Sequence, residues 1–183
     1  DGVVPEPGMV ITEDTTLRPG IYDFSSGQGL IIGADDIVLD GSGAVLIGPG
    51  SLDLGPASFK GTAVYSDGHS GVTVKNLSAK GFQTGLHVKN GEEWTITGNN
   101  FSDNYTNPDY GWGDGEIFSA VLLESVHDSV ISHNRGNNVW NGLHLRHSNR
   151  NEVKFNDFSH TSNVSLKMWN ASENVISDNN FSY

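Results

Sequence analysis

The sequence predicts an all-β domain built as a parallel solenoid, and three observations support this prediction. First, a sixteen-residue pattern returns five times, starting at residues 61, 84, 119, 141 and 164. Second, each copy holds two stretches of alternating apolar residues separated by a polar turn, which is typical of half-buried strands. Third, the starts lie 23, 35, 22 and 23 residues apart. A period of 22–23 residues made of short strands indicates a solenoid in which each repeat forms one coil.

Each copy also ends in an asparagine: Asn76, Asn99, Asn134, Asn156 and Asn179. Asparagine tolerates left-handed backbone and can hydrogen-bond to neighbouring backbone groups, so it suits a sharp corner between strands. Stacked coils would place these side chains about 4.8 Å apart, as a hydrogen-bonding ladder. In three copies a phenylalanine follows the corner, and we expect it to fill the core: Phe101, Phe158 and Phe181.

These repeats resemble the right-handed parallel β-helix repeats of the pectate-lyase-like superfamily, including its carbohydrate-binding and sugar-hydrolysis repeats. The resemblance covers nearly the whole chain and implies a right-handed parallel β-helix. It implies no single activity, because the superfamily holds lyases, hydrolases, epimerases, phage tailspikes and non-catalytic sugar-binding modules. Function must therefore be argued from the side chains of a site.

The chain before residue 61 shows shorter apolar runs separated by turn residues. Residues 1–8 carry two prolines and predict an extended lead-in. The runs within 10–12, 16–17, 20–24, 29–32 and 37–48 predict about two more coils. Residues 49–60 have no periodicity and are expected to form a surface excursion. With the five clear copies this makes about seven coils, in a stack about 34 Å long at ~4.8 Å per coil.

One insertion interrupts the repeat. The 35-residue interval contains about a dozen extra residues at 103–117, with the sequence DNYTNPDYGWGDGEI. Because the insertion enters directly before the first strand of the third copy, we expect it to wall a cleft on the outer face of that strand. Its glycines would let the loop adapt to a ligand.

Composition narrows the class of protein. At 183 residues the chain has the size of one domain, and we expect residues 1–183 to be a module or fragment of a longer protein. The net charge of −12 argues against nucleic acid or an anionic membrane as a partner, and favours neutral over polyanionic sugars. No run approaches the roughly 20 apolar residues of a membrane span. The lack of cysteine excludes a disulfide framework and suits a bacterial-type secreted or periplasmic protein.

Alternation within the first strand of each copy predicts which side chains face solvent. The third and fifth positions should point inward: Leu86/Val88, Val121/Leu123, Leu143/Leu145 and Leu166/Met168. The fourth and sixth positions then form two outward columns. These are Val64, His87, Leu122, His144 and Lys167, and Ser66, Lys89, Glu124, Arg146 and Trp169. The resemblance implies that the outer face of this strand carries the active or binding cleft.

Aromatic residues are expected to flank this face. Flat rings beside polar groups suit sugars, which have an apolar C–H face and a hydroxyl rim. The predicted ligand-binding residues are His87, Lys89, Tyr110, Trp112, Glu124, Trp140, His144, Arg146, Lys167 and Trp169, with Tyr105 beside them. The alternative is structural: the charges form an exposed ion-pair ladder worth under ~1 kcal/mol each, and the aromatic residues only cover the insertion.

Catalysis is harder to derive from the same residues. A glycosidase needs two carboxyls, about 5.5 Å apart for retention or up to about 9.5 Å for inversion, and this face supplies only Glu124. A second would have to come from the insertion: Asp109, Asp114 or Glu116. The resemblance implies aspartate clusters for the hydrolases and lyases of this fold, and these columns contain none. The candidate catalytic residues are Glu124, His144, Arg146 and Lys167, the last three as base or charge neutraliser.

No metal or other cofactor is expected. His87 and His144 should lie two coils apart, roughly 9.6 Å, a gap that Zn–N bonds near 2.1 Å cannot bridge. Three aspartates in early turns leave Ca²⁺ as a weaker alternative: Asp35, Asp36 and Asp40.

The leading interpretation is a non-catalytic carbohydrate-binding β-helix that recognises a neutral plant polysaccharide, with xylan-like chains favoured. Its expected partners are the polysaccharide and a catalytic domain in the same polypeptide. The main alternative is a polysaccharide lyase, glycoside hydrolase or epimerase. A third is a structural or adhesive solenoid of the tailspike kind.

Overall fold

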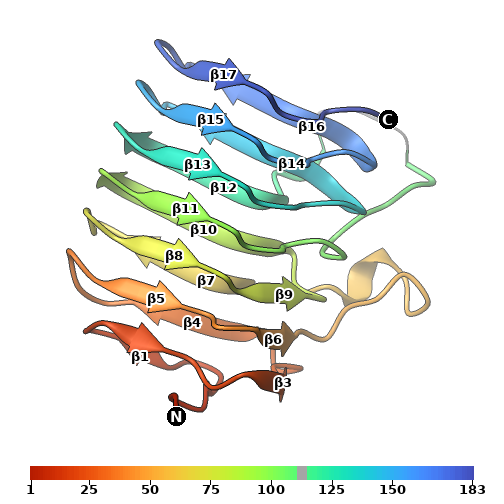
Figure 1. Cartoon of the computed structure of the whole chain (residues 1–183). Coiled ribbons are helices and arrows are strands. Elements are labelled where there is room, and N and C mark those ends of the chain that lie inside the picture. The colour runs from red at the N-terminus through yellow and green to blue at the C-terminus, as the bar shows by residue number, and fades with distance from the viewer. Residues whose placement is uncertain (111–114) are drawn as a thin grey trace.

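A computed structural model describes residues 1–110 and 115–183 and shows a parallel β-helix. Its coils stack along one axis from the N-terminus to the C-terminus (Figure 1). A short 3-10 turn, η1 (Pro56–Ser58), is the one helical element among the described residues. No helix in this part of the chain has the length and hydrophobicity to span a membrane.

Three parallel sheets form the sides of the solenoid. Sheet 1 contains seven strands in the order β1 (Val10–Ile11), β4 (Gln28–Ile32), β7 (Thr62–Asp67), β10 (Thr84–Glu92), β12 (Ser119–His127), β14 (Val139–Arg146) and β16 (Thr161–Trp169). Sheet 2 contains β2 (Thr15–Thr16), β5 (Val38–Asp40), β8 (Thr73–Lys75), β11 (Thr95–Thr97), β13 (Val130–Ser132), β15 (Glu152–Lys154) and β17 (Val175–Ser177). The seven strands of sheet 1 within the described residues confirm the expected number of coils.

Sheet 3 is the shortest. It contains β3 (Gly20–Asp23), β6 (Ala44–Ile47) and β9 (Ser78–Lys80). In the later coils this side continues as single parallel bridges through Asn100, Arg135, Asp157 and Asn180.

The core is filled as the alternation predicts. Phe101, Phe158 and the predicted inward residues of β10, β12 and β14 are fully buried. These inward residues are Leu86, Val88, Val121, Leu123, Leu143 and Leu145. Phe181 is partly buried against the same core. The exception is Met168, which was expected to point inward and is 51% exposed. It lies on β16, the last strand of sheet 1, where no described strand packs beyond it.

Four asparagines form the expected ladder. The side-chain amide of Asn99 donates to Oδ1 of Asn134 (3.0 Å), Asn134 donates to Asn156 (3.0 Å), and Asn156 donates to Asn179 (2.9 Å). Each amide also reaches a backbone carbonyl of the preceding coil, as from Asn134 to Ile96 (2.9 Å). The ladder therefore satisfies buried polar groups at the corner after sheet 2.

The first copy was placed one residue too early. Thr62 pairs with Thr84 and Tyr65 with His87, so this copy starts at Thr62 and not at Gly61. Leu77, and not Asn76, occupies the ladder position, and its N–H donates to Asn99 Oδ1 (3.0 Å).

The error has a conformational cause. Asn76 has φ 55° and occupies the left-handed position that precedes each ladder residue, where later coils have Gly98, His133, Phe155 and Asp178. Asparagine is favoured at both positions, so its presence alone does not fix the register. In consequence Val64 and Ser66 are fully buried, whereas Tyr65 and Asp67 lie on the outer side.

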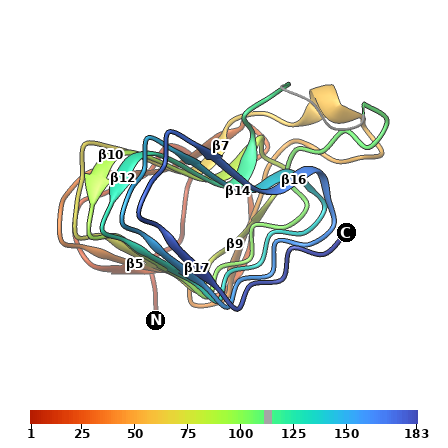
Figure 2. The same cartoon turned by 90° about the horizontal axis from the view of Figure 1, so that it is seen from above.

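Two excursions leave the solenoid at the same corner, just before strands of sheet 1 (Figure 2). The first, residues 48–61, joins β6 to β7 and carries η1; the second is the predicted insertion before β12. They touch through Phe59 and Tyr105, whose ring centroids lie 6.0 Å apart at 77°. The two excursions thus support one another beside sheet 1.

Candidate functional site

The outer face of sheet 1 aligns the predicted columns across β10, β12, β14 and β16. One row contains His87, Leu122, His144 and Lys167, and the next contains Lys89, Glu124, Arg146 and Trp169. At the N-terminal side the rows continue with Tyr65 and Asp67, in place of the predicted Val64 and Ser66. The predicted alignment is therefore right for four coils and wrong for one.

Glu124 is the centre of a polar group that we call the Glu124 cluster (His87, Glu124 and Arg146). Its Oε2 lies 2.7 Å from His87 Nε2, and its Oε1 lies 3.3 Å from Arg146 Nη1. The three side chains are between 17% and 31% exposed. The ring of Tyr65 packs edge-on against His87, at a centroid distance of 5.4 Å. The cluster therefore presents a partly shielded carboxylate between two donors.

His144 does not face solvent as predicted. It is 2% exposed, and neither ring nitrogen makes a well-aligned hydrogen bond. Burial lowers its pKa to about 4, and the positive charges of Lys167 and Arg146 act in the same direction. Glu124 and the Ile117 backbone oppose this shift more weakly. The ring is thus neutral at pH 7 and closed off from any ligand in solution.

Trp140 is also buried, so its predicted place on the binding surface is wrong. It is 1% exposed, and its Nε1 donates to the backbone carbonyl of Glu116 (2.7 Å). Tyr105 packs against it at 6.1 Å and Tyr110 at 5.7 Å. Tyr105 contacts Phe118 as well, at 5.0 Å.

These rings attach the insertion to the outer side of the solenoid. Mutual packing removes much of the apolar surface of Tyr105, Phe118 and Trp140 from water, which is enough to explain why these aromatic residues gather here. The insertion therefore covers part of the predicted cleft, at Trp140 and His144, rather than walling it. Leu122, which pairs with His144, is 1% exposed. Burial, followed by the nearby Glu116 carboxylate, raises the pKa of Tyr105 and keeps its phenol neutral. Trp112 and Asp114 lie outside the described residues.

The exposed part of the predicted face is smaller than the sequence indicated. Trp169 is 58% exposed in the same row as Glu124 and Arg146. Lys167, on the same strand as Trp169, and Lys89, at the other end of the row on β10, are half-buried. Tyr110 is 63% exposed at the edge of the insertion. The accessible surface is thus the Glu124 cluster with Lys89, Lys167 and Trp169.

Elsewhere in the described chain, His69 Nδ1 lies 3.1 Å from Asp35 Oδ1 as a single pair. Among the described residues, Glu124 is the one carboxylate seen in contact with His87 or Arg146. No group of three or more histidine, aspartate or glutamate side chains in residues 1–110 and 115–183 is arranged to hold a metal ion. Two of the three calcium candidates, Asp35 and Asp40, accept hydrogen bonds from the backbone: Ser70 N–H donates to Asp35 Oδ1 (3.0 Å), and Ser42 N–H donates to Asp40 Oδ1 (2.9 Å). Asp36 has left-handed backbone, with φ 56°.

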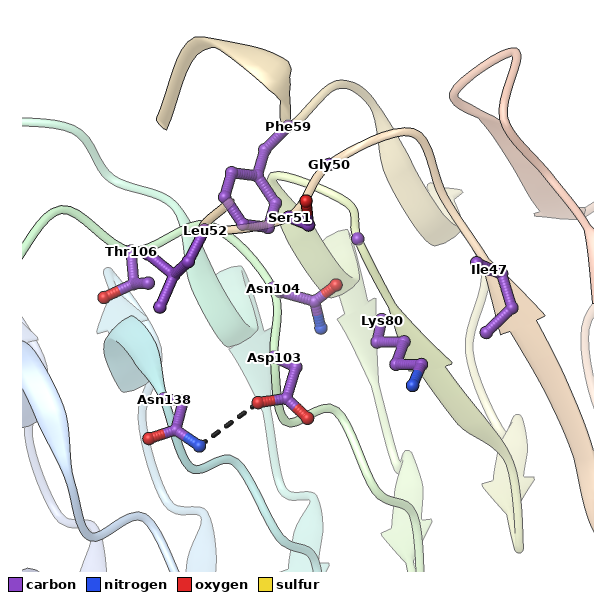
Figure 3. A pocket seen from close by; sticks show the side chains of 11 residues that line it. Ile47, Gly50, Ser51, Leu52, Phe59, Lys80, Asp103, Asn104, Thr106 and Asn138 are labelled. Atoms are coloured by element: carbon purple, nitrogen blue, oxygen red, sulfur yellow. Dashed lines mark hydrogen bonds between the residues drawn. The ribbon is translucent and has the colours of Figure 1, made fainter. Parts of the chain in front are cut away.

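A second surface feature was missed by the sequence analysis. Two adjoining hollows of about 320 and 390 Å³ lie on the sheet 3 side of the excursions. They share Leu52, Thr106 and Asn138, and we call them together the side groove. Figure 3 shows the first hollow, with Phe59 and Leu52 on the excursion and Asp103 bonded to Asn138. Asp103 and His160 each follow a Phe-Ser pair in the sequence, which is the signal that could have pointed to this surface.

Comparison with known proteins identifies the fold family. Searches of the curated proteins and of the solved structures find no match to this chain. Residues 57–183 match the family model described as a right handed beta helix region. The matched segment is well over half of the chain and contains the five coils from β7 to β17. The chain therefore belongs to the family of proteins with a right-handed β-helix region.

Proposed function

We propose that this chain is a carbohydrate-binding β-helix that recognises a neutral polysaccharide through the outer face of sheet 1. Family membership supports a parallel β-helix and leaves the activity open, because this fold hosts many functions. The observation that carries the proposal is the row formed by Glu124, Arg146 and Trp169. It places a charged hydrogen-bonding group and an exposed indole on one face of adjacent strands.

This pairing matches the chemistry of a sugar ring. An indole offers a flat apolar surface to the C–H face of a pyranose, and a carboxylate and a guanidinium offer acceptors and donors to its hydroxyls. His87 and Arg146 hold the Glu124 carboxylate in a fixed orientation, which lowers the entropy lost when a ligand binds. A flexible carboxylate on an open surface would lack this advantage.

The charge of the molecule favours a neutral ligand. The chain carries −12 overall, and Asp67 and Glu124 lie on the binding face itself. These negative charges would repel a polyanionic sugar as it approaches the face. Neutral polysaccharides are therefore the favoured ligands, and xylan-like chains are the first of them to test.

Binding is favoured over catalysis because the two oxygens of Glu124 already contact His87 and Arg146, and no other carboxylate of residues 1–110 and 115–183 is seen in contact with Glu124. His144, the best candidate for a base, is buried beneath the insertion. A polysaccharide ligand fits the expected secreted or periplasmic location and an adjoining catalytic domain, and both stay predictions.

Affinity electrophoresis tests the proposal. The wild-type chain, Trp169→Ala and Glu124→Gln would be run through gels containing xylan, other neutral polysaccharides or pectate. We expect retardation by a neutral polysaccharide, and a rise in Kd of tenfold or more in both variants. Phe155→Ala is the matched control, because Phe155 is a similarly exposed aromatic residue (52%) that follows a strand of sheet 2.

Three outcomes would count against the proposal. Retardation by none of the sugars would refute it, as would equal losses in Trp169→Ala and Phe155→Ala. The same samples would be assayed for new reducing ends and for unsaturated uronates. Release of either product by the wild-type chain would establish the enzyme alternative instead.

A further inference from the structure

The side groove has a regular polar edge. Gly81, Asp103, Asn138 and His160 occupy equivalent places in successive coils, and all four have left-handed backbone, with φ of 85°, 59°, 52° and 56°. The last three carry exposed polar side chains that border the two hollows. Four coils at ~4.8 Å spacing make this edge about 14 Å long.

Part of this edge is already ordered. Asn138 Nδ2 donates to Asp103 Oδ1 at 3.1 Å, and His160 Nδ1 lies 3.0 Å from Ser159 Oγ. The second oxygen of Asp103, the Asn138 carbonyl and His160 Nε2 leave acceptor and donor capacity for a ligand. Lys80 adds an exposed amine at the N-terminal end of the groove.

The opposite side of the groove is apolar and comes from the excursions. Leu52 lines both hollows and is 52% exposed, and Pro108 lines the second. Phe59 lines the first but is itself 3% exposed, held by its contact with Tyr105. The groove therefore has one polar edge with a repeat of one coil and one apolar wall.

The backbone along this edge offers no place for an added peptide strand. Gly81 N–H donates to Asp103 O (2.9 Å), and Asp103 N–H donates to Asn137 O (2.9 Å). Asn138 N–H donates in turn to His160 O (3.0 Å). β-strand addition needs an unpaired row of such groups, so an occupant must be recognised by side chains.

We propose that the side groove is a second carbohydrate site, which binds a linear neutral oligosaccharide parallel to the solenoid axis. A chain of identical sugar units meets the repeating polar edge at each coil, and the C–H faces of its rings lie against Leu52 and Pro108. Asp103 and the net charge of −12 disfavour a polyanionic chain. This site lies around the corner from the Glu124 cluster and does not depend on binding there.

Chemical-shift mapping by NMR, with ¹⁵N-labelled protein titrated with xylohexaose and cellohexaose, tests this site. We expect shifts at Gly81, Asp103, Asn138 and His160 with at least one hexaose, and weaker binding of the matching disaccharide because it spans fewer coils. Asp103→Ala with Asn138→Ala should raise the Kd read from the groove signals at least tenfold. Trp169→Ala should leave these signals and their Kd unchanged.

Asn76→Ala is the matched control. Asn76 is also an exposed left-handed asparagine, and it bonds to Asp40 of the preceding coil at 3.2 Å, but it lies at the ladder corner. Equal loss of affinity in this control would overturn the proposal. So would groove signals that stay fixed at millimolar hexaose, or groove shifts that disappear in Trp169→Ala. Shifts at the groove with none at sheet 1 would support this site and count against the proposed function.

Discussion

His144→Leu should remove a defined part of the pH dependence of stability. In the folded chain the ring is buried and its pKa is lowered from 6.5 to about 4, chiefly by desolvation. In the unfolded chain the ring meets water and takes up a proton below about pH 6.5. A group whose folded pKa is depressed in this way favours unfolding as the pH falls. Its effect grows from pH 6.5 down to about 4 and is constant below that.

The size of the effect follows from proton linkage. At pH 5 the unfolded ring is almost fully protonated, whereas the folded ring is still mostly neutral. With a pKa of 6.5 in the unfolded chain and about 4 in the folded chain, the unfolding free energy falls by about 2 kcal/mol between pH 8 and pH 5. By pH 4 the fall is about 3 kcal/mol. Leucine carries no proton and fits beside Leu122, so the variant should lack this loss.

Urea unfolding at pH 8, 7, 6 and 5 measures the difference. The change in unfolding free energy from pH 8 to pH 5 should be about 2 kcal/mol smaller in His144→Leu than in the wild type. His147→Asn is the control, because the His147 side chain is exposed in the folded chain. Asparagine also suits the left-handed backbone at this position, where φ is 49°. Parallel pH profiles for wild type and His144→Leu would refute the burial argument.

Three further substitutions test the packing. Asn156→Ala should cost about 2–4 kcal/mol in urea unfolding, because it leaves Asn134 N–H and a buried carbonyl without partners; a loss below 1 kcal/mol would contradict the ladder. Phe155→Asn should raise stability by about 0.5–1 kcal/mol, since φ is 57° at an exposed position; a lower melting temperature would argue against this. Trp140→Phe should speed hydrogen exchange at residues 115–118, because the bond to Glu116 O is lost, and unchanged protection there would count against the anchoring role.

The sequence predicted the solenoid well because its periodic residues have one conformational role each. The inward positions of β10, β12 and β14 hold apolar residues in every coil, so alternation alone fixes their direction. The ladder asparagines of the last four copies are equally unambiguous. In the first copy, leucine replaces the ladder asparagine and an asparagine stands one residue earlier. An alignment that matches asparagine with asparagine therefore shifts the first copy by one residue. Each side chain of that strand is then assigned to the wrong face of the sheet.

The site was predicted less well, because the insertion has no period that fixes its path. Strand register correctly placed Glu124 between Lys89 and Arg146 and put Trp169 in the same row. The contact of Glu124 with His87, which belongs to the other row, was not predicted. Whether Trp140 and His144 face solvent depends on how the insertion packs against β14, and no alternation in the sequence encodes this. The side groove has the same origin: it forms between two excursions that are far apart in sequence and meet through Phe59 and Tyr105.

A crystal structure of the chain with bound xylohexaose is the most direct test of the claim that sheet 1 binds sugar. The expected result is a pyranose ring stacked on the Trp169 indole, with hydroxyls bonded to Glu124 and Arg146. Sugar density that is absent from this face at a saturating oligosaccharide concentration, with the indole exposed to water, would contradict it.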